Sequence, residues 1–409
     1  MTDFIRDKVA TRLEGLRRLT DFSNRAGPTY AARRNFDFGQ NKHYHVSGLS
    51  PWIRHRLISE PEVIEAVLIG NAPDSCEKFV QEVVWRMYFK GWLEQRPEVW
   101  RRYRTGLNQW ADQLDKDDDL GRRYDCAVAG KTGIDCFDAW TLELVETGYL
   151  HNHARMWFAS IWVFTLELPW HLGADFFYRH LIDADPASNT LSWRWVCGLH
   201  TRGKHYLASA ENIARFTEGR FNPVGMLNEQ AQALVEDFEA PFNPFSHQNL
   251  DTEAPVGLLL TPEDCSAEWL FEKYNIVATL ALLDSGERSP FAVSEKAKAF
   301  SRAAITDASD RIPNRPQEPV QFESDSDWVA SVGRWARHHR LKTVITSYCP
   351  VGETRDRLDA VKQTLDGRGL KLNSILRLCD QTVWPHASAG FFKVKKKIPS
   401  ILETLGLAE

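Results

Sequence analysis

Two stretches decide the fold of this 409-residue chain: Gly148-Tyr-Leu-His-Asn-His-Ala-Arg-Met-Trp157 and Leu181-Ile-Asp-Ala-Asp-Pro-Ala-Ser-Asn-Thr-Leu-Ser-Trp-Arg-Trp195. In the first stretch, Asn152, Arg155 and Met156 are spaced i, i+3 and i+4. A helix would therefore present an amide, a guanidinium and a thioether on one face. The two histidines beside them are two positions apart and point to different helix faces, so no metal site is predicted.

The second stretch supplies the partner that a buried arginine requires. Asp183 can pair with Arg155, and the polar residues Asp185, Ser188 and Asn189 predict a loop of hydrogen-bond donors and acceptors. Two tryptophans follow that loop. Taken singly, each feature is as typical of a capped turn or a core aromatic as of a binding site.

Two earlier segments carry further candidates. In Val46-Ser-Gly-Leu-Ser-Pro51, Ser50 is predicted to cap a helix that Pro51 begins, and a helix start with free hydroxyls suits a phosphate. An ordinary capped helix is the commoner interpretation. Glu82 and Trp85 share one helix face, where a carboxylate could bind a base edge while the indole stacks on it. For that pair alone, an amphipathic core helix with a surface Glu is the favoured interpretation.

The Gly130-Lys-Thr-Gly133 segment invites comparison with a nucleotide-binding P-loop. That motif requires a first glycine where Asp125 stands, and a strand before it, which the pattern lacks. The sequence therefore excludes a P-loop NTPase.

Hydrophobic periodicity divides the chain into a helical part, residues 1–238, and an α/β part, residues 256–409. Between them, residues 239–255 contain three prolines and few aliphatic residues, which predicts a linker. Short apolar runs alternate with helical stretches in the α/β part and indicate a parallel sheet. The runs are Val256–Leu260, Ile276–Leu283 and Lys342–Tyr348, and the helical stretches are Ser294–Ala308, Asp327–Leu341 and Glu353–Leu365.

Composition excludes several classes. A net charge of −5 argues against a globally basic nucleic-acid coat, although a local basic groove can exist within it. Basic clusters at residues 54–56, 101–104 and 393–397 could contact phosphates or be solvated faces, and the solvated face is favoured for the last.

The sequence predicts a cytoplasmic protein without a membrane segment. It begins with charged residues and no apolar signal region, and its seven cysteines form no C-x-x-C pair, which is typical of reduced thiols. The most apolar stretch, Met156–Trp170, is too short to span a bilayer and contains Glu167, so we expect a buried core helix there.

Taken in order, these segments resemble the FAD domain of the photolyase/cryptochrome family. The shared pattern comprises a Leu-Ser-Pro phosphate turn, Glu-x-x-Trp-Arg, Gly-Lys-Thr-Gly, His-Asn followed by Arg-Met, Asp-x-Asp with a nearby Asn, and Trp-x-Trp. The match covers roughly Thr11 to Pro223. It implies a mainly α fold: an all-helical FAD-binding domain followed here by a smaller, Rossmann-like α/β domain.

The resemblance implies FAD as the cofactor and assigns roles around it. Asn189 takes the place facing flavin N5, where photolyases typically carry Asn, and Arg155 would lie over the flavin. Trp193 and then Trp170 would begin an electron-transfer chain. The cofactor-binding residues implied are Tyr30, Ser47, Gly48, Leu49, Ser50, Asn152, Arg155, Asp183, Asp185 and Asn189.

Glu82, Trp85, Asn152 and Met156 match the positions that hold a flipped pyrimidine dimer in UV-damaged DNA. Cyclobutane dimers are favoured, because (6-4) repair enzymes carry His at the last two positions. The implied activity is that of a deoxyribodipyrimidine photo-lyase: light excites reduced FAD, an electron passes to the dimer, the ring splits and the electron returns. A cryptochrome-type photoreceptor with an unknown signalling partner is the alternative, and a flavoprotein that lost both roles is a third.

Several positions depart from the family pattern. Val46 replaces a Thr and Asp135 replaces a Pro. Met87 in place of Glu, His153 in place of Arg, the net charge and the lack of a Trp just before Gly130, where the usual relay ends, favour the photoreceptor; Trp110 is a candidate substitute for that Trp. The family places an α/β antenna domain before the helical one. The α/β part here is either a permuted antenna domain, which could bind a folate or deazaflavin as a second chromophore, or an unrelated appendage.

Overall fold

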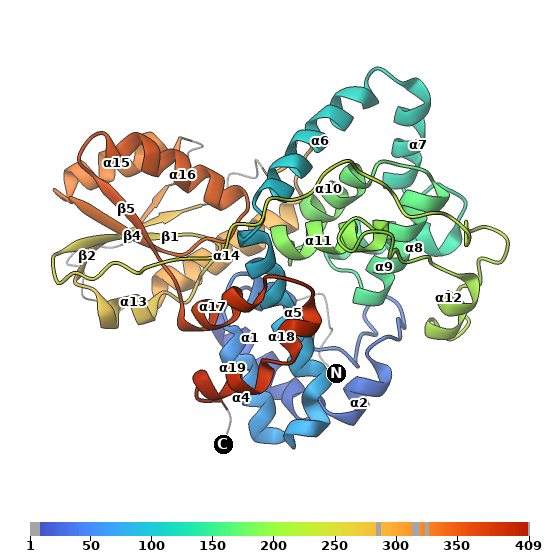
Figure 1. Cartoon of the computed structure of the whole chain (residues 1–409), viewed down its shortest axis with the longest axis horizontal. Coiled ribbons are helices and arrows are strands. Elements are labelled where there is room, and N and C mark those ends of the chain that lie inside the picture. The colour runs from blue at the N-terminus through green and yellow to red at the C-terminus, as the bar shows by residue number, and fades with distance from the viewer. Residues whose placement is uncertain (1–8, 284–287, 313–319, 324–326, 408–409) are drawn as a thin grey trace.

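The structure, a computed structural model, describes residues 9–283, 288–312, 320–323 and 327–407. Helices make up the first part of the chain, and the described strands all follow residue 255 (Figure 1). The elements of the first part are α1 (Arg12–Ser23), α2 (Pro28–Arg33), α3 (Ser50–Arg54), α4 (Glu60–Gly70), α5 (Pro73–Glu94), α6 (Glu98–Leu114), α7 (Asp118–Val128), α8 (Asp135–Thr147), α9 (Asn152–Ser160), the π-helical turn η1 (Ile161–Thr165), α10 (Trp170–His180), α11 (Pro186–Cys197) and α12 (Ala210–Phe216).

Local signals explain where several of these helices begin and end. A capping box formed by Ser59 and Glu62 starts α4. The next helix, α5, begins with Pro73 in its first turn and runs for 22 residues through the middle of the helical part. Gly148 ends α8 in the left-handed conformation, with φ 65°, which glycine adopts without strain.

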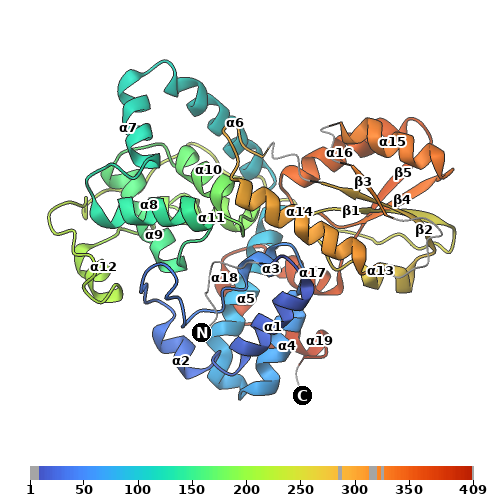
Figure 2. The same ribbon diagram turned by 180° about the vertical axis from the view of Figure 1, so that it is seen from behind.

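The α/β part contains a five-stranded parallel sheet in the order β3-β2-β1-β4-β5, the doubly wound arrangement. In Figures 1 and 2, α15 and α16 cover one face of the sheet, and α13 and α14 cover the other. The elements are β1 (Val256–Leu260), α13 (Glu268–Lys273), β2 (Ile276–Leu282), α14 (Glu295–Asp310), β3 (Gln321–Glu323), α15 (Trp328–His338), β4 (Thr343–Ser347), α16 (Glu353–Asp366) and β5 (Lys371–Ile375).

Alternation along the strands divides their apolar side chains between two cores. Leu259 and Val344 belong to a core shared with α15 and α16. Their neighbours Leu258, Leu260 and Ile345 face the other way and join one continuous core with the helical part. The sheet is therefore packed on one side against the rest of the molecule.

The last helices leave the sheet and return to α5. They are α17 (Leu378–Val383), the 3-10 turn η2 (Trp384–His386), α18 (Phe391–Lys395) and α19 (Ile398–Thr404). Contact is close, because a Cβ added at Gly91 of α5 would lie 2.8 Å from the Trp384 Cα. The limits 1–238, 239–255 and 256–409 stay a prediction, and this packing groups residues 378–404 with the helices rather than with the sheet. Residues 1–8 and 408–409 at the outer limits lie outside the described part.

Buried ion pairs join the two parts. Arg54 at the end of α3 forms two hydrogen bonds with Glu263, of 2.6 and 2.7 Å, and Arg56 forms two with Asp380, of 2.7 and 2.8 Å. All four side chains are buried. The predicted alternatives for residues 54–56, a phosphate contact or a solvated face, are both wrong, because both arginines are buried and paired with carboxylates of the protein itself.

The fold class is confirmed, and three local predictions need correction. Leu49, not Ser50, is the cap residue of α3, and Ser50 is its first helical residue. The stretch Met156–Trp170 is not one helix, because α9 gives way to η1 and a turn before α10. Ser188 and Asn189 lie in the first turn of α11 rather than in a loop. Among the described residues, no helix is both long and apolar enough to cross a bilayer.

Candidate cofactor and substrate site

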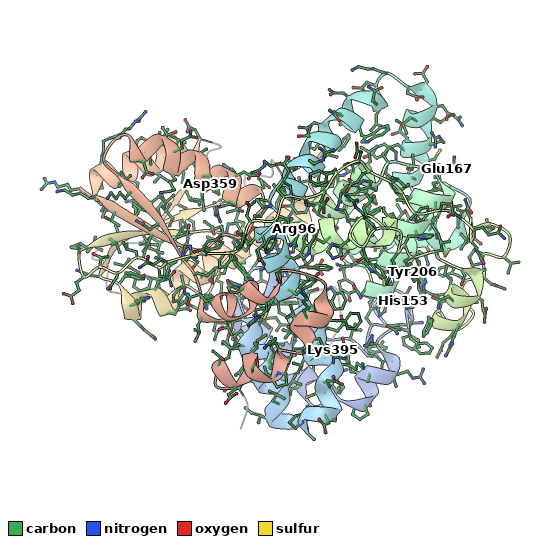
Figure 3. The ribbon with its side chains drawn as sticks, in the orientation of Figure 1. Arg96, His153, Glu167, Tyr206, Asp359 and Lys395 are labelled. Carbon is green, nitrogen blue, oxygen red and sulfur yellow. The ribbon has the colours of Figure 1, made fainter. Side chains whose placement is uncertain are left out.

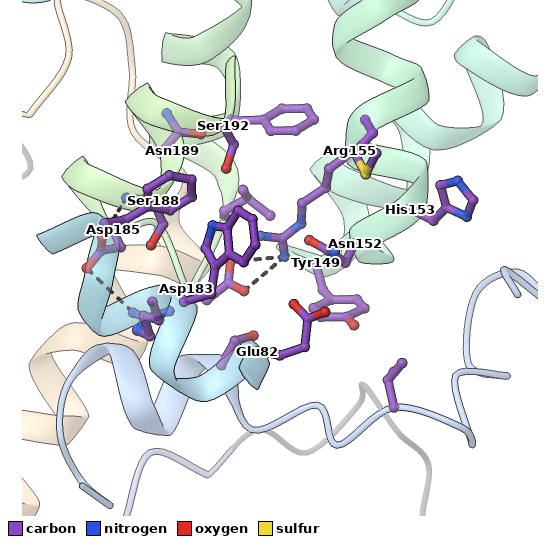
Figure 4. Close-up of a pocket in the computed structure, with 18 of the residues that line it drawn as sticks. Glu82, Tyr149, Asn152, His153, Arg155, Asp183, Asp185, Ser188, Asn189 and Ser192 are labelled. Atoms are coloured by element: carbon purple, nitrogen blue, oxygen red, sulfur yellow. Dashed lines mark hydrogen bonds and ion pairs between the residues drawn. The ribbon is translucent and has the colours of Figure 1, made fainter. Parts of the chain in front are cut away.

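One cavity of about 570 Å³ gathers most of the predicted site residues, within the range of ligand pockets (Figure 4). Its walls come from α5, α9, α11, the turn before α3 and the loop before α11. Leu49 is fully buried beneath the turn and does not line the cavity, and Trp170 lies outside it. The predicted residues that line it are Tyr30, Ser47, Gly48, Ser50, Glu82, Trp85, Asn152, Arg155, Met156, Asp183, Asp185, Asn189 and Trp193.

The Arg155–Asp183 pair forms as the sequence predicts. The Ile182 N–H donates to the Gly148 carbonyl at 3.0 Å, which holds the loop before α11 against the start of α9. Arg155 Nη2 then donates to both Asp183 oxygens, at 3.1 and 2.9 Å (Figure 4). Burial raises the pKa of Asp183, but the Arg155 charge and hydrogen bonds from Arg155 and Ser50 outweigh it and lower the pKa overall.

Asp185 is fixed at the start of α11 and surrounded by cations. Its Oδ1 accepts from the Ser188 N–H at 2.8 Å, which caps the helix. Its Oδ2 lies 3.5 Å from Arg86 and 3.6 Å from Lys90. Burial opposes ionisation, but Lys90, Arg86 and Arg54 lower the pKa of Asp185 strongly, so this side chain is a carboxylate that accepts hydrogen bonds at neutral pH.

Several polar atoms of the cavity wall lack a protein partner, which fits a polar ligand. The Ser188 hydroxyl and the Trp193 indole N–H are buried without a hydrogen bond. Asn189 Nδ2 donates to the Ala174 carbonyl at 2.8 Å, which fixes the amide and leaves Oδ1 as its free acceptor side. Gly48 has φ 62°, a conformation that suits a tight phosphate-binding turn. These features fit the heteroatom-rich ring and the phosphates of FAD.

The predicted substrate residues lie together on α5 and α9. Glu82 and Asn152 are exposed at the cavity wall, whereas Trp85 and Met156 are half-buried there. Glu82 lies 3.8 Å from Arg34, and packing around it raises the pKa of its carboxyl although Arg34 opposes that effect. Trp85 also packs against Phe391 of α18, with 4.0 Å between ring centroids and the rings tilted by 34°.

The tryptophans proposed for electron transfer occupy two clusters. Trp193 lines the cavity and packs edge-on against Trp162, at 6.3 Å between centroids. Trp170 stacks on Tyr103 at 5.6 Å. The clusters approach at Gly173, one helical turn after Trp170, where an added Cβ would lie 2.4 Å from the Trp193 ring. Trp110 is 37% exposed, and its role in a relay stays a prediction.

Sequence reasoning missed three basic residues of the site. Arg86 lines the cavity, Lys90 is buried beneath Asp185, and Arg34 lies beside Glu82. Arg86 and Lys90 follow Glu82 at intervals of four on α5, so helical spacing could have identified them. Arg34 gave no such signal, because it lies far from its partner in the sequence.

The comparisons with known proteins agree with this geometry. Residues 79–229 match the family model described as the FAD binding domain of DNA photolyase. A deoxyribodipyrimidine photo-lyase from Streptomyces griseus is 32% identical over 157 residues, which are 38% of this chain and 33% of that protein. One from Alkalihalophilus pseudofirmus is 32% identical over 197 residues, 47% of this chain and 38% of that protein.

Among solved structures, a bacterial class III photolyase from Agrobacterium tumefaciens aligns with a TM-score of 0.41 at 27% identity, over 51% of this chain and 43% of that one. The alignments with the two curated photo-lyases, from Streptomyces griseus and Alkalihalophilus pseudofirmus, cover about a third of the length of those proteins. The predicted resemblance to the photolyase/cryptochrome family, with FAD as the cofactor, is confirmed over residues 79–229, which match the FAD binding domain of DNA photolyase.

Proposed function

We propose that this protein is a light-driven deoxyribodipyrimidine photo-lyase that splits cyclobutane pyrimidine dimers in UV-damaged DNA. The observation that supports it best is that one cavity combines a polar, partly unpartnered wall with the group of Glu82, Trp85, Asn152 and Met156. Reduced FAD, once bound and excited by blue light, would supply the electron that opens the dimer.

The inner wall would hold the cofactor. Ser47, Gly48 and Ser50 would bind the pyrophosphate, and Arg155, oriented by Asp183, would lie over the flavin. Asp185 would accept from the N–H groups of the flavin edge, because its cationic neighbours keep it ionised. Asn189 Oδ1 would accept from N5–H without adding charge, since Nδ2 is already engaged by Ala174. Tyr30 would close the wall beside the pyrophosphate.

The outer wall would receive the extruded dimer. Trp85 would stack on the bases with the face that Phe391 leaves open, and Met156 would give an apolar contact. Asn152 would hydrogen-bond the base edges. The Glu82 carboxyl would hydrogen-bond the base edge. Extrusion is favoured for a dimer because damaged bases pair and stack weakly.

One observation favours a cryptochrome-type photoreceptor instead. At the position where the family's repair pocket carries Arg, His153 is buried. Its Nδ1–H donates to the Asn35 carbonyl at 2.9 Å, and its ring stacks on Trp157 at 4.1 Å between centroids. The mouth of the cavity therefore has one cation fewer for a DNA phosphate. A second chromophore in the α/β part stays a prediction, as does the cytoplasmic location.

The decisive experiment compares light with dark. The purified protein is first examined for the near-UV and visible absorbance of a bound flavin, then reduced and mixed with single- and double-stranded oligonucleotides that contain one thymine dimer. Dimer loss under blue light above the dark control supports repair, and E82A should slow it about 5- to 100-fold. E65A, at an exposed position of α4, is the matched control. A flavin-loaded protein without dimer loss would support the photoreceptor, and an absent flavin would refute both.

A further inference from the structure

Helix α18, the last helix but one, forms part of the surroundings of the predicted substrate residues. Phe391 is buried between Trp85, at 4.0 Å, and Tyr88, at 5.6 Å between ring centroids. The approach to α18 is fixed by two hydrogen bonds to backbone carbonyls: Gln95 Nε2 to Trp384 O at 2.9 Å and Arg96 Nη2 to Ser388 O at 2.7 Å. Figures 1 and 3 show α18 lying along α5, with Lys395 labelled on it.

The outer side of the same helix has a different character. Phe392, next to the buried Phe391, is 75% exposed. Lys393, Lys396 and Lys397 are also exposed, and none of them forms an ion pair with any residue that the structure describes. The backbone stays helical through Lys396, so Phe392 and Lys396 share one face.

This arrangement is costly for a solvated surface. Four lysines within five positions repel one another, and only Lys395 has a carboxylate near it, Glu77 at 3.6 Å. The chain as a whole carries a charge of −5, so the cluster is a local reversal of sign beside the cavity. An exposed aromatic ring among unpaired lysines matches the two elements of an unpaired nucleic-acid strand, a base face and phosphates.

We infer that residues 391–397 form a DNA-contact element of the substrate site. Phe392 stacks on an unpaired base next to the extruded nucleotide, and Lys393, Lys396 and Lys397 bind the adjoining phosphates. The inference rests on the proposed function, for which it names the surface that binds the strand around the lesion. An anionic membrane fits less well, because membrane-bound helices bury a broad apolar face and this one exposes a single ring.

Binding is measured in the dark by fluorescence anisotropy, with the full chain and a labelled oligonucleotide that contains one thymine dimer, at several salt concentrations. In K393Q/K396Q/K397Q, the slope of log affinity against log salt should decrease by about 2 to 3. F392A should weaken binding about 5- to 150-fold with an unchanged salt slope, and F392Y should restore it. The matched control K362Q/R368Q/K371Q removes three exposed cations from the α/β part and should bind normally.

Three results would overturn the inference: wild-type affinity in both test variants, an equal loss in the control, or a loss confined to anionic phosphatidylserine vesicles. All substituted residues are exposed, so the unfolding temperature of each variant should match that of the wild-type protein. A match shows that lost binding is not caused by misfolding. Light-driven dimer loss at saturating DNA separates the two claims. If no variant or wild-type protein repairs DNA while the lysine variant still loses binding, the proposed function fails and the inference stands. If repair proceeds and binding is unchanged, the inference fails alone.

Discussion

Replacing Glu263 by Gln should destabilise the whole protein, because it leaves the Arg54 guanidinium buried without its counter-charge. Both side chains are nearly inaccessible, 6% and 5% exposed, and they share two short hydrogen bonds. Removing one partner of a buried ion pair costs about 3–5 kcal/mol. Gln keeps one acceptor, and Arg54 Nε keeps its bond to the Ala184 carbonyl at 2.6 Å. We therefore expect the lower end, about 3 kcal/mol.

The double variant R54M/E263M tests the cause. It removes both charges, and buried pairs replaced by apolar residues are often neutral. The Ala184 carbonyl loses a donor and the Thr354 hydroxyl loses an acceptor, and leaving a buried polar group unpaired costs about 1–3 kcal/mol. The double variant should thus be no less stable than E263Q. It should also be clearly more stable than the summed free-energy losses of the single variants R54M and E263M predict. E295Q, which removes an exposed partner of Lys298, is the control and should unfold at the same urea concentration as wild type.

Urea unfolding followed by circular dichroism and by tryptophan fluorescence gives these free energies, and the two probes should report one transition. An E263Q variant within about 0.5 kcal/mol of wild type would refute the reasoning, since it would mean that water or a shifted loop replaces the pair. Strict additivity in the double variant would do the same, because independent residues do not couple.

Three further predictions concern single residues. Burial raises the pKa of Asp175 to about 6, so the contribution of its protonated form to stability is present at low pH and lost as the pH rises through 6. D175N should therefore stabilise the protein at pH 8 by up to about 3 kcal/mol and hardly at pH 4, as measured by urea unfolding. The lowered pKa of Asp183 means that it stabilises the folded state above about pH 4 and less as the pH falls further, so D183N should be less stable at pH 7 and show a flatter acid profile; a profile parallel to wild type would contradict this. G173A should cost about 1–3 kcal/mol and shift flavin absorbance, because its Cβ would lie 2.4 Å from the Trp193 ring, whereas G333A on α15, with 3.5 Å of clearance, should be neutral.

The sequence predicted those parts of the fold whose signals are local. The apolar runs that became β1, β2 and β4 were evident, because central parallel strands are buried on both faces. The edge strand β5, Lys371-Leu-Asn-Ser-Ile375, was missed, since Lys, Asn and Ser are poor strand formers and only its two apolar residues are buried. The three-residue β3 offers too short a pattern to detect.

The same limit applies to the site. Arg155 and Asp183 could be paired from sequence because a helix face and a short loop bring them together. The partners of Arg54 and Arg56 lie 209 and 324 positions away, and no local pattern distinguishes a buried arginine from a solvated one. The contact of Phe391 with Trp85 depends on the return of the chain to α5, which helical periodicity does not encode.

These long-range contacts make the proposed cofactor wall dependent on the α/β part. Glu263 binds Arg54, which holds the Ala184 carbonyl one residue before Asp185, and Thr354 at the start of α16 donates to the same glutamate at 3.2 Å. A Cβ at Gly352 would lie 2.5 Å from Pro186, so the loop before α16 also packs closely against the first turn of α11. The position of Asp185 is thus set from both parts of the chain. Because contacts and not chain order determine this wall, an α/β part that follows the helices can support it as well as one that precedes them, since only the linker between them must change.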